Sequence, residues 1–453
     1  MADKKETLMD TKKAPTKVAV IHVYLKNNLE DKKNAAFKLE EAVSLTQAIN
    51  LEPSYQSSHG LSRYLPATLL TKGIVEEAKE LFEELEISLL IINHPLSPIQ
   101  QRNLERALKV KVIDRTGLIL EIFGERAQTK EGRLQVELAA LTFQRSRLVR
   151  SWTHLERQRG GLGFVGGPGE TQIEIDRRLI DERVARIKNE LSKVVKTRNE
   201  NRKKRKSIPY PIVALVGYTN AGKSTLFNTL TDANVFAEDL LFATLDPTMR
   251  KHKLPSGREI IFSDTVGFIS DLPTQLIAAF RATLEEVLEA DIILHVRDIS
   301  SDHSDTQKQD VLKILKELGL SEDVLNEKVV EVLNKCDLLS DEEYVDALRY
   351  ARFKQEGAHD EDGHSPEKIL ISARTGKNID YLVHSIEDRI HEFLQQKTYE
   401  VSVIDGKVIA WIDAHMDVIS KTMQENNILK IDAFTDITTD SRLKKQFQVK
   451  DVS

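Results

Sequence analysis

Cysteine is nearly absent from this sequence: Cys336 is the only cysteine among 453 residues. A single thiol excludes an internal disulfide framework and any metal cluster built from cysteines, so we expect a reducing compartment and no structural zinc. Apolar runs of roughly 18 residues or more, which a membrane-spanning helix needs, are also missing. Residues 1–17 are polar and lysine-rich, lack the apolar stretch of a secretory signal, and are expected to form a flexible tail. The sequence therefore predicts a cytoplasmic protein without a membrane span.

Acidic and basic side chains are unevenly distributed along the chain. The net charge is −6, but residues 101–207 contain 26 Lys and Arg against 14 Asp and Glu, so this segment carries +12 and the remainder −18. A basic segment in an acidic protein can be the electrostatic footprint of a polyanion. A solvated helical face has the same composition, so charge alone leaves both interpretations open.

Residues 18–130 are predicted to form an α/β unit. The β-branched run at 18–24 is followed by apolar residues at helical spacing. A helical pattern at 73–85 and short apolar runs at 87–93 and 110–113 continue the alternation. This order predicts a small, partly parallel sheet.

Residues 131–207 are predicted to form an antiparallel helical hairpin. Leucine and other apolar residues recur in a heptad-like pattern over 134–155, and a similar pattern resumes over 180–194. The glycine-dense stretch 160–169 between them suits a flexible tip that joins two antiparallel helices. The basic run 202–207 and the prolines after it end the second helix, which makes this the clearest domain boundary.

Residues 208–396 alternate strands and helices. Residues 397–453 are predicted to form a small α+β domain with strands at 399–404 and 428–434 and a helix over 407–423 between them. The predicted strands of the first segment are 212–216, 259–263, 291–296, 328–333 and 368–372. Such alternation predicts a doubly wound, mostly parallel sheet. The predicted fold class is therefore α/β: a P-loop domain preceded by a small α/β domain with a helical hairpin and followed by a small α+β domain.

A phosphate-binding motif follows the first of these strands. Gly217 and Gly222 are separated by four residues, and Lys223 and Ser224 then open a helix. The glycines let backbone N–H groups turn toward phosphate oxygens, and the helix N-terminus adds a partial positive charge. Lys223 is expected to reach the β- and γ-phosphates, and the Ser224 hydroxyl to ligate Mg²⁺. The residues predicted to bind the phosphates are Gly217, Tyr218, Thr219, Asn220, Ala221, Gly222, Lys223 and Ser224.

Two further segments indicate that the base is guanine. The motif Asn-Lys-Cys-Asp at 334–337 ends a predicted buried strand at the carboxyl edge of the sheet, where α/β ligand sites form. The Asp337 carboxylate can accept hydrogen bonds from N1–H and the amino group of guanine, and adenine offers neither donor there. Asn334 can bridge the base and the P-loop, the stem of Lys335 can lie over the ring, and the Ala373 N–H can donate to guanine O6. The residues predicted to bind the base are Asn334, Lys335, Cys336, Asp337, Ser372, Ala373 and Arg374.

Two segments between these motifs are predicted to sense the γ-phosphate. The run Asp264, Thr265, Val266, Gly267 follows a predicted strand, so Asp264 can hold Mg²⁺ through water while the Gly267 N–H contacts the γ-phosphate. The upstream loop is predicted to contact the nucleotide through Phe242, Ala243, Thr244, Leu245 and Asp246. One threonine hydroxyl must complete the Mg²⁺ shell, and we favour Thr244 over Thr248. The predicted metal ligands are thus Ser224 and Thr244, and the residues predicted to act in catalysis are Lys223, Thr244 and Gly267.

The residue after Gly267 is a phenylalanine, Phe268. Many GTPases have a glutamine at this position, whose amide orients the attacking water. Phenylalanine cannot form a hydrogen bond with water. The sequence therefore predicts slow intrinsic hydrolysis, with a partner or another residue positioning the nucleophile.

Together these motifs resemble those of the HflX family of translation-factor-related GTPases. The resemblance rests on LFATLDPT at 241–248 and DTVGFISDLP at 264–273, and it extends to the segments 96–105, 114–141 and 160–178. It implies a GTPase with Mg²⁺ as its cofactor that hydrolyses GTP to GDP and phosphate and acts as a monomer. It also implies that the partner is the large ribosomal subunit with its rRNA, and that the protein splits or rescues stalled ribosomes under stress.

The resemblance would place the basic hairpin against rRNA. Arg157, Arg159, Arg177, Arg178 and the run 202–206 would then contact rRNA phosphates, so affinity should fall as salt rises. Alternatively, the basic side chains pair with acidic ones at helical spacing. Residues 174–178 could equally form an interface with the GTPase domain.

Two other functions fit the same sequence. The protein could assist RNA modification or ribosome assembly, or, because of Phe268, it could be a GTP-dependent adaptor without catalytic activity. The loop 357–364 holds two histidines among acidic residues, but their spacing is not that of a metal site, and we expect an exposed insertion. The role of the C-terminal domain and any use of ATP are left open.

Overall fold

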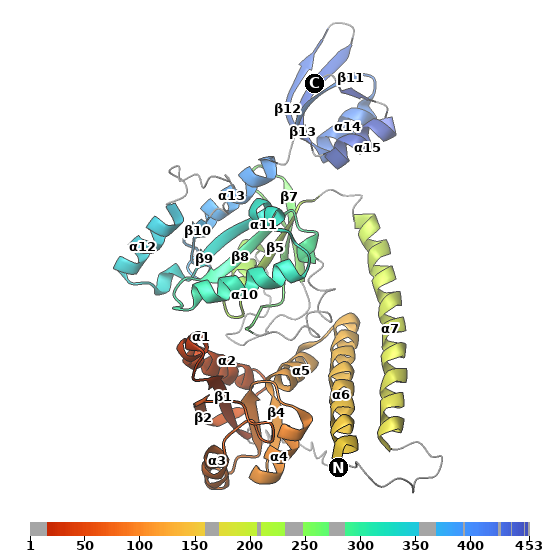
Figure 1. Ribbon diagram of the computed structural model, residues 1–453. Coiled ribbons are helices and arrows are strands. Elements are labelled where there is room, and N and C mark those ends of the chain that lie inside the picture. The colour runs from red at the N-terminus through yellow and green to blue at the C-terminus, as the bar shows by residue number, and fades with distance from the viewer. Residues whose placement is uncertain are drawn as a thin grey trace, which may run out of the picture. The chain divides into compact units, whose positions relative to one another are not determined.

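The computed structural model describes most of the chain as three groups that each contain a sheet, together with a pair of long helices (Figure 1). The described residues are 16–158, 172–205, 210–231, 248–270, 286–352, 368–392, 395–424, 427–435, 437–447 and 449–451. Among them, no helix is both long and apolar enough to span a membrane. The loop 357–364 and the glycine-dense stretch 160–169 lie outside the described residues.

The N-terminal group is a four-stranded parallel sheet in the order β2-β1-β3-β4. Its strands are β1 (Lys17–Leu25), β2 (Glu52–Leu61), β3 (Leu89–Asn93) and β4 (Lys111–Asp114). Its helices are α1 (Leu29–Lys33), α2 (Ala35–Gln47), α3 (Lys72–Glu84), α4 (Pro98–Leu108) and α5 (Arg115–Arg126). The start of α4 is fixed locally, because the Ser97 side chain accepts from the Gln100 N–H and the Gln100 side chain accepts from the Ser97 N–H. Ile21, Leu90 and Phe82 lie in the core of this sheet.

Two long helices follow, α6 (Lys130–Gln158) and α7 (Gln172–Arg205). Arg183 on α7 donates two hydrogen bonds to the Glu137 carboxylate on α6, at 2.7 and 2.9 Å. Arg145 on α6 forms an ion pair of 2.7 Å with Asp181 on α7. Because residues later on α6 pair with residues earlier on α7, the two helices run antiparallel, as the apolar patterns predict.

The central group is a six-stranded sheet in the order β10-β9-β8-β5-β7-β6, in which only β6 is antiparallel to its neighbour. Its strands are β5 (Ile212–Gly217), β6 (Thr248–Lys253), β7 (Glu259–Asp264), β8 (Ile292–Asp298), β9 (Val329–Asn334) and β10 (Lys368–Leu370). Its helices are α8 (Lys223–Thr231), α10 (Ser304–Glu317), α11 (Glu322–Lys328), the 3₁₀ turn η1 (Cys336–Leu338), α12 (Asp341–Arg352) and α13 (Ile379–Glu392). The predicted fold class, an α/β domain with a mostly parallel sheet, is confirmed.

The position of each strand in this sheet follows from its residues. β5 is a continuous apolar run, and β9 is apolar except for Glu331 and Asn334, because helices cover both faces of a parallel sheet. In contrast, β6 has the sequence TMRKHK, and such charged strands belong at sheet edges, where they oppose pairing with another chain. The chain moves to one side of β5 to form β7 and to the other side to form β8. Ligand sites in open α/β sheets lie at such a reversal, outside the carboxyl ends of the strands.

The C-terminal group is a four-stranded antiparallel sheet in the order β12-β13-β11-β14. Its elements are β11 (Gln395–Ser402), α14 (Gly406–His415), β12 (Asp417–Met423), β13 (Ile428–Thr435), α15 (Ile437–Phe447) and β14 (Lys450–Asp451). This order of elements and strands is that of the ferredoxin-like fold. The sequence predicts a helix over 407–423, but α14 ends at His415, and residues 417–423 pair with β13 as a strand instead.

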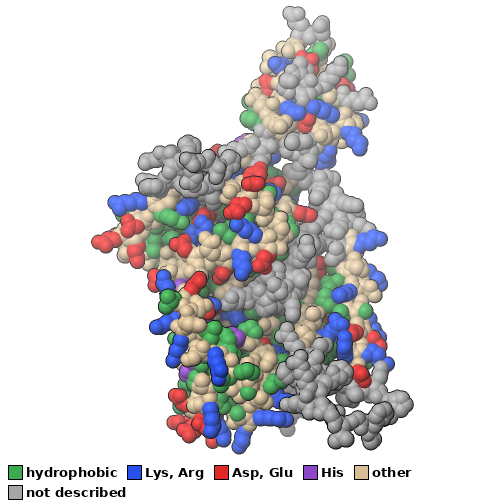
Figure 2. All heavy atoms as spheres, viewed as in Figure 1, with side chains coloured by type: hydrophobic (Ala, Val, Ile, Leu, Met, Phe, Trp, Pro, Cys, Tyr) green, Lys and Arg blue, Asp and Glu red, His purple; other side chains and the backbone are tan. Residues whose placement is uncertain are grey.

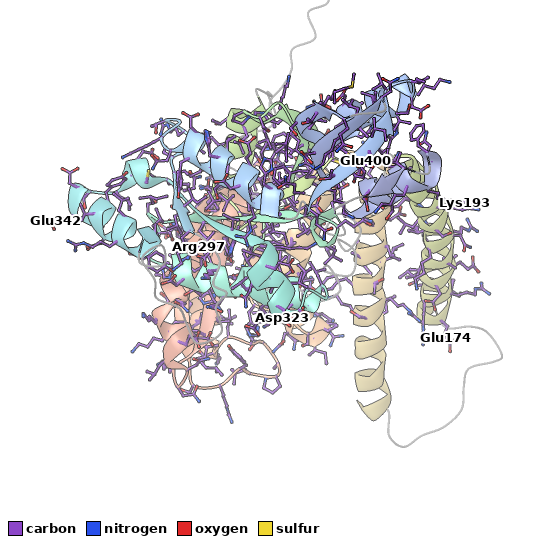
Figure 3. The ribbon with its side chains drawn as sticks, turned by 90° about the horizontal axis from the view of Figure 1, so that it is seen from above. Glu174, Lys193, Arg297, Asp323, Glu342 and Glu400 are labelled. Carbon is purple, nitrogen blue, oxygen red and sulfur yellow. The ribbon has the colours of Figure 1, made fainter. Side chains whose placement is uncertain are left out.

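An ionic network centred on the buried Arg297 and Glu331 lies between β8, β9 and α10. Arg297 on β8 (Figure 3) pairs with Glu331 on β9 at 2.8 Å and with Asp305 on α10 at 2.5 Å. Lys308 on α10 also pairs with Glu331, at 2.5 Å. His295 is buried beside Glu331 on the same face, and burial lowers the pKa of this imidazole to about 3 although the Glu331 charge acts in the opposite direction.

The low pKa of His295 predicts that acid destabilises this sheet. An unfolded histidine binds a proton near its ordinary pKa, about 6.5, whereas the folded one stays neutral down to about 3. The free energy of unfolding should thus be largest above about pH 6.5 and fall by about 2 kcal/mol from pH 7.5 to pH 5 through His295 alone. Urea unfolding at the two pH values should show this loss reduced in His295→Gln. The exposed His384→Gln is the control, and an equal loss in both variants would contradict the assignment.

Candidate nucleotide-binding site

The P-loop connects β5 to α8 at the carboxyl edge of the central sheet. β5 ends at Gly217 and α8 begins at Lys223, so residues 218–222 form the turn. Asn220 and Gly222 have φ values of 59° and 91°, in the region that favours glycine and asparagine. A side chain at Gly222 would place its Cβ atom 2.3 Å from the Asn334 amide nitrogen, so only glycine fits there.

Lys223 is the first residue of α8, and its buried ammonium group lies against this turn. The residue is 6% exposed, and its ammonium donates a hydrogen bond of 2.8 Å to the Tyr218 carbonyl. Burial lowers the pKa of Lys223 to about 8, while the nearby Asp264 carboxylate acts to raise it. A charged amine held in a dry turn is stabilised by an anion, so the site fits a phosphate group.

The Ser224 hydroxyl and the Asp264 carboxylate meet beside the P-loop. Ser224 comes from the first turn of α8, Asp264 is the last residue of β7, and the hydroxyl donates to the carboxylate at 2.8 Å. Asp264 is fully buried. Hydroxyl and carboxylate oxygens are the hard ligands that Mg²⁺ prefers, so this pair fits a magnesium ion. Within the described part of the chain, no cluster of three or more His, Cys, Asp or Glu side chains could hold a metal by itself.

Asn334 connects the P-loop to the loop after β10. Its amide nitrogen donates to the Ala221 carbonyl at 2.9 Å, and its amide oxygen accepts from the Ala373 N–H at 2.9 Å. The Ala373 N–H, predicted to donate to guanine O6, is therefore directed at Asn334 in this structure. The P-loop, the loop after β9 and the loop after β10 are thus joined by the buried side-chain amide of Asn334.

The loop at the end of β9, which the sequence predicts to bind the base, is shaped by its backbone and by Asp298. Lys335 has a left-handed conformation, with φ at 66°, and its ammonium pairs with Asp298 at 2.8 Å. Cys336 is buried beside Leu333 and Leu370, and burial raises the pKa of its thiol. The Asp337 side chain is exposed, so its carboxylate is accessible to a ligand.

The segment after Asp264 runs back along the P-loop. The Phe268 N–H donates to the Gly217 carbonyl at 3.0 Å, and the Phe268 carbonyl accepts from the Thr219 N–H at 2.7 Å. The Phe268 side chain is 3% exposed. Position 268 therefore contributes a buried aromatic ring to the protein interior in this structure.

Comparison with known proteins assigns the chain to a family. Residues 36–124 match a family model described as GTP-binding GTPase N-terminal, residues 126–205 one described as GTP-binding GTPase Middle Region, and residues 212–335 one described as 50S ribosome-binding GTPase. The chain is similar to the GTPase HflX of Magnetococcus marinus, with 48% identity over 84% of each chain. It is also similar to the GTPase HflX of Escherichia coli, with 37% identity over 97% of this chain and 98% of the relative.

The chain belongs to the HflX family of GTPases. The resemblance stated from the sequence motifs is thereby confirmed, as is the prediction that the protein is a GTPase. Among solved structures, a GTP-binding protein from the archaeon Sulfolobus solfataricus in complex with GDP is 24% identical, covers 83% of this chain and 99% of its own, and gives a TM-score of 0.44.

The structure of this HflX-family protein brings most of the predicted site residues to one edge of the central sheet. Residues 217–224, 264–267, 334–337 and 372–374 lie at or just after the carboxyl ends of β5, β7, β9 and β10. Phe242, Ala243, Thr244, Leu245 and Asp246 lie outside the described residues. Thr248 is the first residue of β6 and pairs with Asp264 on β7. Because Thr244 is not among the described residues, the choice of Thr244 as a metal ligand stays a prediction.

Sequence reasoning missed one residue that shapes this site, Asp298, and one contact of a residue that it had included, Tyr218. Asp298 holds Lys335, and the Tyr218 hydroxyl accepts a hydrogen bond of 2.6 Å from the Ser270 N–H. The position of Asp298 at the carboxyl end of the predicted strand 291–296 was an available signal. No such signal existed for the contact of Tyr218, because it joins segments that are far apart in the sequence.

Proposed function

We propose that this protein binds GTP with Mg²⁺ at the P-loop and hydrolyses it in response to the large ribosomal subunit, splitting or rescuing stalled ribosomes. The convergence of Lys223, Asp264 and Asn334 on one P-loop carries the nucleotide part of the proposal. The family model matched by residues 212–335, described as 50S ribosome-binding GTPase, supports the ribosomal part.

Each residue has a separate task in the proposed mechanism. Lys223 neutralises the negative charge that grows on the phosphates, and Asp337 selects guanine at the opposite end of the nucleotide. Ser224 and Asp264 would hold Mg²⁺, which supplies charge neutralisation between the β- and γ-phosphates when bound. The buried Phe268 ring leaves position 268 without a hydrogen-bonding group, which agrees with a partner that positions the attacking water.

The basic side chains of α7 support an RNA partner. Arg177, Arg178, Arg186, Lys188, Lys193 and Lys196 are all exposed on this helix. Figure 2 shows blue side chains along α7. Arg177 is 4.0 Å from Asp181, so this arginine is partly compensated by an acidic neighbour. The other exposed cations are proposed to contact rRNA phosphates, which would make binding depend on salt.

GTP turnover with and without large ribosomal subunits tests this proposal. Subunits should stimulate turnover strongly at low salt and much less at high salt. The charge reversal Lys193→Glu with Lys196→Glu should weaken the apparent affinity for subunits by about tenfold, since each cation contributes a phosphate contact. The matched control is Lys313→Glu with Lys316→Glu, which has the same spacing on exposed positions of α10. Equal turnover with and without subunits would mean that the partner is wrong, and stimulation by immature precursors alone would favour a role in ribosome assembly.

A further inference from the structure

Residues 266–270 lie along the P-loop like an added strand. Phe268 exchanges two backbone hydrogen bonds with Gly217 and Thr219, at 3.0 and 2.7 Å. These bonds continue the parallel pairing of β5 with β7, which ends at Leu215 and Asp264. All five residues of the segment are buried.

A third hydrogen bond in this arrangement comes from a side chain. The Tyr218 hydroxyl accepts from the Ser270 N–H at 2.6 Å, and both residues are at most 5% exposed. The two bonds of Phe268 join backbone groups, which nearly every residue type possesses. Tyr218 is therefore the position at which the side chain decides how firmly the segment is held.

The segment places Gly267 against the functional end of the P-loop. A Cβ atom built on Gly267 would lie 2.7 Å from the Thr219 methyl carbon and 3.0 Å from the Lys223 ammonium nitrogen. Gly267 thus sits beside the lysine that, in the proposed function, reaches the γ-phosphate. A contact that fixes this segment fixes the distance between Gly267 and Lys223.

We propose that Tyr218 is a positioning residue for GTP hydrolysis, whose hydroxyl holds the segment 266–270 on the P-loop and so keeps Gly267 beside Lys223. The inference rests on the proposed function, because it needs the γ-phosphate to lie at Lys223. GTP and GDP differ only by that phosphate. Loosening the segment therefore weakens the binding of GTP and leaves the binding of GDP unchanged.

The test is Tyr218→Phe, which removes the hydroxyl and keeps the ring. Affinities for GDP and for a non-hydrolysable GTP analogue are measured by fluorescence on the full chain. The affinity for the GTP analogue should fall about fivefold, the typical contribution of one buried hydrogen bond, while the affinity for GDP stays the same. The control is Tyr399→Phe, which removes a buried hydroxyl bonded to Asp440 at 2.9 Å in the C-terminal sheet.

Hydrogen exchange provides a second readout that does not depend on nucleotide. The Ser270 amide should exchange about fivefold faster in Tyr218→Phe than in the unchanged protein and no faster in Tyr399→Phe. Equal losses for GDP and the GTP analogue, or no change in either readout, would overturn the role of Tyr218. If the unchanged protein bound neither nucleotide, the proposed function would fail first and this inference with it.

Discussion

Asp337→Asn should lower the affinity for GDP by about a hundredfold to a thousandfold and create affinity for xanthosine diphosphate. In the proposed function the carboxylate accepts two hydrogen bonds from guanine, and a site built for such bonds rejects strongly a partner that cannot form them. The asparagine amide can instead donate to xanthine, which carries a carbonyl group where guanine carries its amino group. Asp337 is exposed in the middle of η1, so the substitution should leave the fold unchanged.

Titration of Asp337→Asn and of a control variant with fluorescent GDP and fluorescent xanthosine diphosphate checks this exchange of specificity. Asp323→Asn, at an exposed position in the first turn of α11 (Figure 3), removes the same charge from the same group of elements and should change neither affinity. Unchanged GDP binding by Asp337→Asn would show that another group reads the base.

Lys223→Met should reduce GTP turnover by about a thousandfold, because it removes a positive charge that acts in a dry site where charge develops in the transition state. The same substitution should leave the nucleotide-free protein as stable as before, or more stable. Burial already lowers the pKa of Lys223 to about 8, which means that the folded protein holds the charged form at a cost. Loss of function without loss of stability identifies a residue that acts on a ligand.

Thermal unfolding without nucleotide and single-turnover hydrolysis measure the two effects separately. Lys328→Met is a matched control, because the Lys328 ammonium also donates to a backbone carbonyl, that of Ala290, at 2.8 Å. The control should keep normal turnover. If Lys223→Met unfolded far below the temperature of the control, its loss of activity would say nothing about phosphate binding.

The sequence predicts the parts of the fold that have a local signature. The apolar runs of β5 and β9 and the heptad-like stripes of α6 and α7 are visible without a structure. The strand β2 is not, because its residues EPSYQSSHGL are mostly polar and become a strand only through pairing with β1. The same holds for β12, whose sequence continues a helical pattern until its pairing with β13 decides otherwise.

The candidate site divides in the same way. The motifs around Lys223 and Asp337 predict a guanine nucleotide from sequence alone, since the chemistry of each motif lies in neighbouring residues. The contacts Lys335 to Asp298 and Ser270 to Tyr218 depend on how distant segments meet, and no spacing within one segment encodes them. Asp298 could be singled out by its place at a strand end and Tyr218 by the P-loop motif, but the contacts that the two residues form could not be derived from the sequence.

The single amide of Asn334 also limits how this sequence can change. This amide is hydrogen-bonded to Ala221 in the P-loop and to Ala373 in the loop after β10. Its nitrogen lies so close to Gly222 that a Cβ atom at position 222 would clash with it. A larger residue at 222 would displace Asn334 and disturb the loop at 373 in one step. Position 222 and the loop at 373 are therefore coupled through Asn334, so a larger residue at 222 should be tolerated only together with a change at 334.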